Sequence, residues 1–105
     1  MSHFYSRNFI IIIFTIFLLV FLSQSGFSAQ VTLGWNPNIE ADLAGYRVYY
    51  GTASRTYGPP IDVGNVTTYA LTGLIKGQKY YITVTAYTKS NRESRFSNEV
   101  TEIAK

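Results

Sequence analysis

Apolar and polar residues alternate with a period of two along most of this chain of 105 residues, and Gly, Pro and Asn separate the alternating runs. The clearest run covers residues 79–88 and follows Gly77. Because successive side chains of a strand point to opposite faces of a sheet, this run predicts a strand with one buried face. Its inward residues are Tyr80, Ile82, Val84 and Ala86, and its outward residues are Tyr81, Thr83, Thr85 and Tyr87.

Five further runs predict shorter strands, and nothing after residue 28 shows a helical period. They cover residues 31–35, 45–51, 61–63, 67–72 and 97–103. Short strands separated by turn residues at regular intervals are typical of an all-β sandwich or barrel. We expect the core to contain Trp35, Val48, Leu71, Leu74, Tyr80, Ile82 and Val84.

The first 28 residues follow a different pattern. Arg7 precedes an apolar run from Phe9 to Leu22 that only Thr15 interrupts, and small and polar residues follow it. This order is that of a secretory signal peptide. The run has about 14 residues, fewer than the roughly 20 that a helix needs to cross the hydrocarbon core of a bilayer. We therefore expect a signal-peptide helix in residues 1–28 and one folded domain in residues 29–105.

Small residues permit cleavage before Ala29 or before Gly26, and retention of the whole segment as a membrane anchor is the alternative. Each outcome predicts an exported domain, which is secreted, periplasmic or held at the cell envelope. The chain has no Cys, so it carries neither a disulfide nor a lipid-attachment cysteine, although export would permit both.

The expected mature domain has few groups suited to catalysis. The only His is His3, inside the expected signal, so the usual general base is absent together with the thiol nucleophile and the soft metal ligands. Glu40 and Asp42 offer two carboxylates in one loop, but without a calcium-loop signature they are better explained as polar loop residues. We expect no enzyme activity, no cofactor and no metal site.

The charge balance argues against a nucleic-acid partner. The chain has nine Lys and Arg, one of them Arg7 in the expected signal, against six Asp and Glu. The remaining surplus of about two positive charges is far from the dense basic face that nucleic-acid binding demands.

Several separate positions of the domain resemble the fibronectin type III family. Trp35 lies where that family keeps the core tryptophan of its second strand, and residues 46–50 (Tyr-Arg-Val-Tyr-Tyr) match the third strand. Leu74 and Tyr80 match the leucine and tyrosine around the crossing between the two sheets, and residues 97–100 resemble the start of the last strand. The resemblance covers Gln30 to about Ile103 and implies an immunoglobulin-like β-sandwich, used as a spacer or a binding surface. It also implies that the Tyr80 hydroxyl bonds to the backbone just upstream, as a tyrosine corner.

The chain departs from the family at its first strand. Too few residues separate a cleavage site from Trp35 to supply a full strand there, so we expect this strand to be short or missing. Its absence would expose unpaired backbone groups along Gln30 to Trp35, and such edges invite pairing with another strand. We expect either a partner or second copy of the chain at this edge, or simple tolerance of a short exposed edge.

The resemblance also places two candidate binding regions. The outward side chains Arg47, Tyr49, Tyr81 and Tyr87 would share one solvent face, because the strands that carry them are neighbours in this family. Aromatic faces with polar tips suit proteins and sugars, and the alternative is cross-strand pairing that only stabilises the sheet.

The second region is the loop 88–96, with its charged residues Lys89, Arg92, Glu93 and Arg95. It lacks the Arg-Gly-Asp tripeptide of adhesive family members, and a basic loop could contact an anionic polymer or be only a solvated loop. The sequence thus predicts a non-catalytic interaction module whose partner is a protein or a polysaccharide. Self-assembly at the cell surface is a further alternative, and the membrane enters only through an uncleaved signal.

Overall fold

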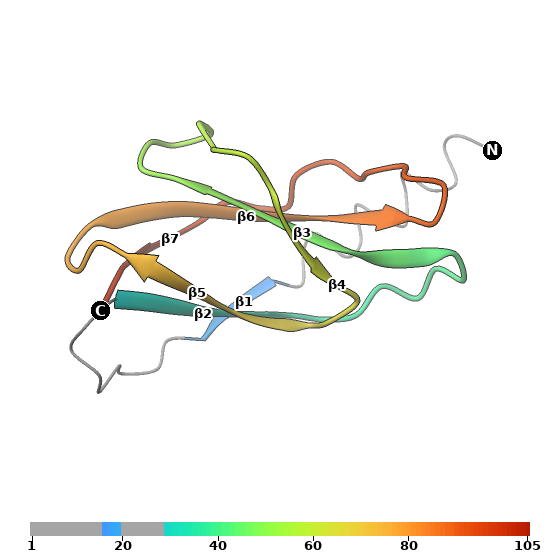
Figure 1. The fold of residues 1–105 in the computed structure, drawn as a ribbon, viewed down its shortest axis with the longest axis horizontal. Helices are drawn as coiled ribbons and strands as arrows, with labels where there is room; N and C mark the ends of the chain where they lie inside the picture. Colours follow the sequence, from blue (N-terminus) through green and yellow to red (C-terminus); the bar gives the residue numbers. More distant parts are fainter. Residues whose placement is uncertain (1–15, 20–28) are drawn as a thin grey trace.

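The computed structural model of this protein describes residues 16–19 and 29–105, and within them every regular element is a strand. The strands lie in two sheets (Figure 1), which confirms the all-β prediction. Their bounds are β1 Ile16–Leu19, β2 Ala29–Trp35, β3 Leu43–Gly51, β4 Ile61–Gly64, β5 Thr68–Leu74, β6 Lys79–Thr88 and β7 Val100–Ile103.

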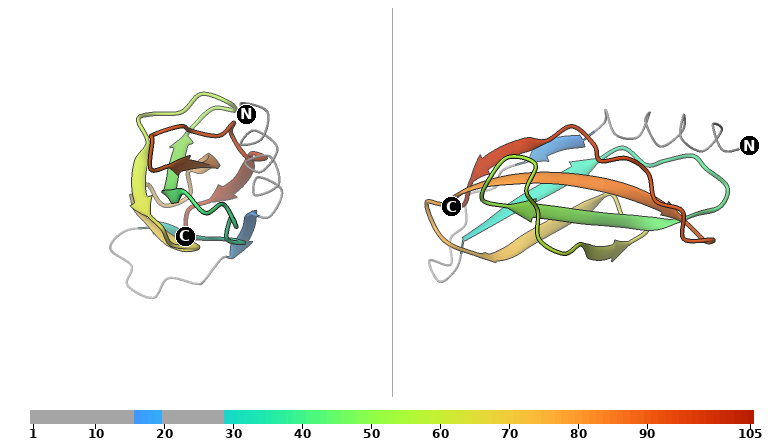
Figure 2. Two further views of the ribbon diagram at one scale, coloured as in Figure 1. Left: turned by 90° about the vertical axis from the view of Figure 1, so that its right-hand side faces the viewer. Right: turned by 90° about the horizontal axis from the view of Figure 1, so that it is seen from above.

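One sheet has the order β1-β2-β5 and the other the order β4-β3-β6-β7. Every paired neighbour is antiparallel. The two sheets face each other as layers, as the end view of Figure 2 shows. All seven predicted core residues are buried between these layers. Tyr46 and Val48 have no exposed surface at all, and the ring of Tyr46 packs edge to face against Trp35 of the other sheet at 5.4 Å.

The crossing from β5 to β6 has the predicted tyrosine corner. The backbone N–H of Ile75 donates a hydrogen bond of 2.9 Å to the Tyr80 hydroxyl, and Leu74 is buried beside it. Gly77 has a φ of +86°, in the left-handed region that favours glycine, so the bend after Leu74 requires this residue type.

The last strand is shorter than the predicted residues 97–103, because it lacks the first three of them. The ladder of β7 begins at Val100, not at Ser97. Ser97 still lies against β6, where its N–H donates to the Val84 carbonyl at 3.0 Å and its hydroxyl accepts from the Val84 N–H at 2.9 Å. A side-chain oxygen therefore replaces the carbonyl that a regular ladder would supply, and the segment before β7 stays irregular.

The N-terminal segment adds a short first strand. β1 lies antiparallel to β2, with Leu19 opposite Thr32 and Ile16 opposite Trp35. These four residues belong to the stretch in which we expected a signal-peptide helix, so at this place the structure has a strand, and the rest of that expected helix lies outside the described residues. The strand beside β2 has four described residues, and they come from the apolar run. No helix in the described residues is long and apolar enough to cross a membrane.

Candidate binding face

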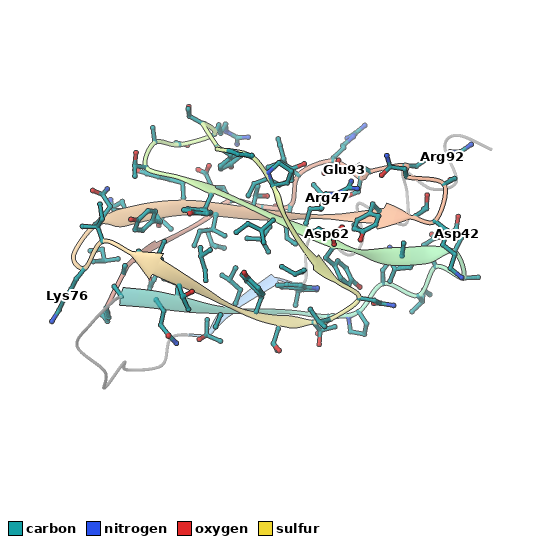
Figure 3. All side chains as sticks on the ribbon, in the orientation of Figure 1. Asp42, Arg47, Asp62, Lys76, Arg92 and Glu93 are labelled. Carbon is teal, nitrogen blue, oxygen red and sulfur yellow. The ribbon has the colours of Figure 1, made fainter. Side chains whose placement is uncertain are left out.

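Arg47 lies at the centre of the outer face of the four-stranded sheet. Its Nη1 forms a salt bridge of 3.0 Å with Glu93, and its Nη2 donates to the side-chain oxygen of Asn91 at 2.8 Å. The guanidinium also lies 4.0 Å from the ring centroid of Tyr87, a cation–π contact. These contacts tie the middle of β3 to the end of β6 and to the loop after β6 (Figure 3).

Tyr87 extends the same network to the edge strand β4. Its hydroxyl lies 2.7 Å from both carboxylate oxygens of Asp62, which also accepts the Gly64 N–H at 3.0 Å. The hydrogen bond from Tyr87 and the Gly64 N–H both favour the ionised carboxylate, so the pKa of Asp62 is lowered. We call these five residues the Arg47 network: Arg47, Asp62, Tyr87, Asn91 and Glu93.

Glu93 is the acceptor that holds the loop on the sheet. Besides the salt bridge, its second oxygen accepts the Tyr49 hydroxyl and the Thr85 hydroxyl, the latter at 2.7 Å. Burial, followed by the hydrogen bond to the Glu93 carboxylate, raises the pKa of Tyr49 to about 12. Both oxygens of Glu93 are therefore occupied by groups of this chain.

Three aromatic rings gather next to the network. The ring of Phe96 lies 4.9 Å from that of Tyr49 and 5.2 Å from that of Tyr57, both edge to face, and Tyr49 and Tyr57 are 6.3 Å apart. Such spacings are those of favourable aromatic pairs. Phe96 is nonetheless 50% exposed. We call Tyr49, Tyr57 and Phe96 the aromatic cluster.

The turn that carries Tyr57 is fixed by Glu99. The Glu99 carboxylate accepts the hydroxyls of Tyr57 and Ser54 and the backbone N–H of Arg55, the last two at 2.7 Å. The Tyr57 hydrogen bond lowers the pKa of Glu99, and burial together with the same bond raises the pKa of Tyr57. Tyr57 is thus held in place over the sheet by a bond between segments more than 40 positions apart.

A shallow hollow of about 240 Å³ lies between the aromatic cluster and the loop after β6. Apolar ring edges and polar groups meet in its wall. Its lining residues are Tyr49, Thr85, Glu93, Ser94, Arg95 and Phe96.

The structure brings together three of the four residues that were predicted to form the binding face. Arg47, Tyr49 and Tyr87 are joined through the contacts above, whereas Tyr81 lies opposite Gly51 at the far end of β6. Six positions along the strand separate Tyr81 from Tyr87, so Tyr81 is on the same side of the sheet but away from the network.

Two residues that were predicted to be exposed on this face are buried. Thr83 is 0% and Thr85 2% exposed, because the chain between β6 and β7 folds back over them. The Thr83 hydroxyl lies 2.7 Å from that of Ser97, and Thr85 donates to Glu93. The prediction was wrong here because it counted strand alternation and could not include a loop that covers the outer face.

Of the charged side chains in the loop after β6, Glu93 belongs to the Arg47 network. The negative charge of Glu93 is paired with Arg47 in a salt bridge. The side chains of Lys89 and Arg95 have no hydrogen-bond or ion-pair partner among the described residues. Arg92 lies at the loop tip (Figure 3). Asn91 has a φ of +66°, which its short polar side chain tolerates, and this turn aims its side chain at Arg47. The loop is therefore basic on its outer side and anchored on its inner side.

Sequence reasoning missed four residues of this region: Tyr57, Phe96, Asp62 and Glu99. The available signals in the sequence were Phe96 at the end of a polar loop and Tyr57 inside a turn. Neither signal shows which strand lies beneath the side chain. The described residues contain no group of three His, Cys, Asp or Glu that could hold a metal ion, and Glu40 and Asp42 form none.

Comparison with known proteins gives one family for most of the chain. The model of the fibronectin type III domain matches residues 21–103. A Kelch domain-containing protein of Saccharolobus solfataricus is 43% identical over 65 residues, which are 62% of this chain and 9% of that protein. The chain thus spans less than a tenth of the length of this curated relative.

Solved structures share the fold. An Fn3-like protein from Clostridium thermocellum is 31% identical, with a TM-score of 0.59 over 81% of this chain and 84% of its own. The FN1–FN3 domains of chicken CNTN1 superpose with a TM-score of 0.68 at 20% identity, over 84% of this chain and 30% of that one.

Proposed function

Since this chain belongs to the fibronectin type III family, we propose that it is an exported, non-catalytic binding module whose ligand contacts the outer face of the sheet β4-β3-β6-β7. The ligand would lie on the aromatic cluster and in the adjoining hollow, next to the Arg47 network. This proposal rests on the site and not on the fold alone, because one fold serves many functions.

The exposed ring of Phe96 is the observation that carries the proposal. A ring that is half exposed, although Tyr49 and Tyr57 pack against it, leaves apolar surface in water. Aromatic side chains at the centre of an interface supply much of its binding energy, and Tyr and Arg are the usual companions. Here Phe, Tyr and Arg side chains lie within one patch.

The rigidity of the patch supports the same function. Glu93 and Glu99 each bind several groups from segments distant in sequence, so Tyr49 and Tyr57 are held before any ligand arrives. A pre-organised surface loses less conformational freedom on binding, which favours affinity. Both carboxylates serve as acceptors for this chain's own side chains, which leaves them poorly placed for general acid–base catalysis.

Single substitutions in the aromatic cluster test the proposal. The immobilised chain is first used to isolate a ligand from envelope extracts and from a panel of soluble polysaccharides. We then expect Phe96→Ser and Tyr57→Ser to weaken the affinity for that ligand at least tenfold, which corresponds to about 1.4 kcal/mol. Ile39→Ser is the matched control, because Ile39 is 93% exposed in the loop after β2 and makes no contribution to the cluster.

The outcome separates the ligand classes as well. A protein ligand whose affinity falls in both cluster variants but not in the control supports a protein-binding module. A polysaccharide with the same behaviour assigns carbohydrate binding, for which ring faces beside carboxylates are also suited. Equal affinity of all three variants would refute a role for this face. Intact masses of the secreted, periplasmic and membrane fractions test export separately.

A further inference from the structure

The second strand presents one edge of its backbone to β1. The Trp35 N–H donates to the Thr67 carbonyl, just before β5, at 2.9 Å. Because successive N–H groups of a strand point to opposite edges, those of Thr32 and Gly34 point the other way, toward β1. Gln30 alternates in step with Thr32 and Gly34, so its N–H should point to the same edge. It does, because this N–H donates to the Lys105 carbonyl at 3.1 Å and not to β5.

This edge is covered by two separate pieces of chain. The C-terminal residue covers its beginning through the bond to Gln30, and β1 covers its end, from Thr32 to Trp35. The right-hand view of Figure 2 shows β2 between β1 and β5. Only the second cover depends on the N-terminal segment.

The residues of β1 form a strand in the structure but belong to a segment that is predicted to act as a signal-peptide helix. Ile16–Leu19 form a strand on β2, but they also lie inside the apolar run of the predicted signal peptide, which acts as a helix and is then removed. Cleavage before Gly26 or Ala29 would take β1 away. The N–H and C=O groups of Thr32 and Gly34 would then lose their partner strand, while β5 remains on the other side.

The edge left behind has none of the usual protections. The segment Ala29–Trp35 contains no charged residue and no proline. The edges of the other sheet differ, because β4 begins directly after Pro59 and Pro60 and carries Asp62, and β7 carries Glu102. Charges and prolines are the devices by which natural edges avoid pairing.

Two identical edges of this kind satisfy each other. The structure shows that the edge accepts an antiparallel strand, and two copies of one strand in antiparallel pairing obey twofold symmetry. Like residues come near the axis in such a pair, which costs nothing here because none of them is charged. The result is a continuous sheet in the order β5-β2-β2-β5 across two molecules.

We infer that β1 is a removable cover, and that its loss lets the β2 edge pair with the β2 edge of a second copy of this chain. The unprocessed chain would be a monomer and the processed chain a dimer. Export would then be coupled to assembly, since the segment that directs export also blocks the edge. This inference depends on removal of the N-terminal segment and not on the proposed ligand.

Sedimentation velocity over a concentration series tests it on the full chain and on the chain that begins at Ala29, both in the same mild detergent. The shortened chain keeps the whole buried core of the described residues, from Ala29 to Ala104. We expect a monomer for the full chain and a dimer for the shortened one. Thr32→Pro should raise the dimer dissociation constant at least tenfold, because it removes an N–H that faces only the open edge.

Ala70→Pro is the matched control on the opposite edge of the same sheet. Ala70 is opposite Thr32 in the register, and its N–H points away from β2, so this change should alter the dissociation constant less than twofold. A shortened chain that is monomeric at every concentration would overturn the inference, as would equal effects of the two proline variants.

Amide exchange on the full chain provides a second, independent measurement, which tests whether β1 covers the edge and can overturn the inference even if the shortened chain does not fold. If β1 covers the edge, the amides of Thr32 and Gly34 exchange slowly, like that of Leu33, which faces β5. Fast exchange at Thr32 and Gly34 beside a slow Leu33 would show that β1 is no cover, and the inference would fail.

Discussion

The guanidinium of Arg47 lies 4.0 Å from the centroid of the Tyr87 ring, while the same group holds Glu93 by a salt bridge of 3.0 Å. One side chain thus joins the inner strands of the larger sheet to the loop that follows them. The loop's position over the outer face depends on this link, and so does the hollow that Glu93 lines.

Arg47→Lys should destabilise the domain although it keeps the charge. A lysine cannot bond Glu93 and Asn91 with two nitrogens and also stack on Tyr87. We expect a loss of about 1 kcal/mol in the free energy of unfolding, from a cation–π contact and a surface ion pair. Urea unfolding measures it. Arg95→Lys, where the guanidinium has no partner among the described residues, should stay within about 0.5 kcal/mol of the parent.

Ser97→Ala should cost more than Ser94→Ala. Each serine hydroxyl accepts a backbone N–H of β6, that of Val84 for Ser97 and that of Ala86 for Ser94. Ser97 is buried, so its loss leaves an N–H without a partner and should lower the free energy of unfolding by about 2 kcal/mol. Ser94 is half-buried, so water can replace it at a cost below about 1 kcal/mol. Equal losses would show that burial does not decide the effect.

Tyr80→Phe tests the tyrosine corner. The change keeps the ring, which packs edge to face against Tyr50 at 5.8 Å, and removes only the acceptor of the Ile75 N–H. We expect the free energy of unfolding to fall by about 1 kcal/mol, the usual net value of one hydrogen bond. Tyr69→Phe, at a half-buried tyrosine whose hydroxyl has no hydrogen bond among the described residues, provides the control. A larger loss in the control would contradict the assignment.

Acid should destabilise the domain through Asp62 and Glu99. The folded state lowers the pKa of both carboxyls, by the hydrogen bonds of Tyr87 and Tyr57 respectively. Their contribution is therefore complete above the unfolded pKa values of roughly 4, and it is lost as the pH falls through the lower folded values. Urea midpoints between pH 7 and pH 2 follow this loss.

Tyr87→Phe is the variant that isolates the Asp62 part of this pH dependence. Without the hydroxyl, the pKa of Asp62 should return toward its ordinary value, so the midpoint should fall less steeply below pH 4 than in the parent. An unchanged slope would mean that the Tyr87 hydrogen bond does not favour the ionised Asp62 in the folded state.

The sequence by itself determined the fold and its core. Strict alternation in residues 79–88 allows only one register in which Ile82 and Val84 face the other sheet, because a shift by one residue would turn both to the opposite face. The Gly77 bend and Tyr80 are likewise local, because a positive φ and a bond five residues away need no distant partner. The strand and its inward residues were predicted from this alternation, whereas the hydrogen bond of the Tyr80 hydroxyl was expected from the resemblance to the family.

Only the tertiary structure decided what lies over the outer face. Glu93 contacts Arg47 and Tyr49 across more than 40 positions, and Phe96 reaches Tyr57 from another turn, so no period along the chain records these contacts. The same folding-over buried Thr83 and Thr85, which alternation had placed in solvent. The pairing of Ile16–Leu19 with the edge of β2 was decided in the same way, since it requires two separate segments to meet in space.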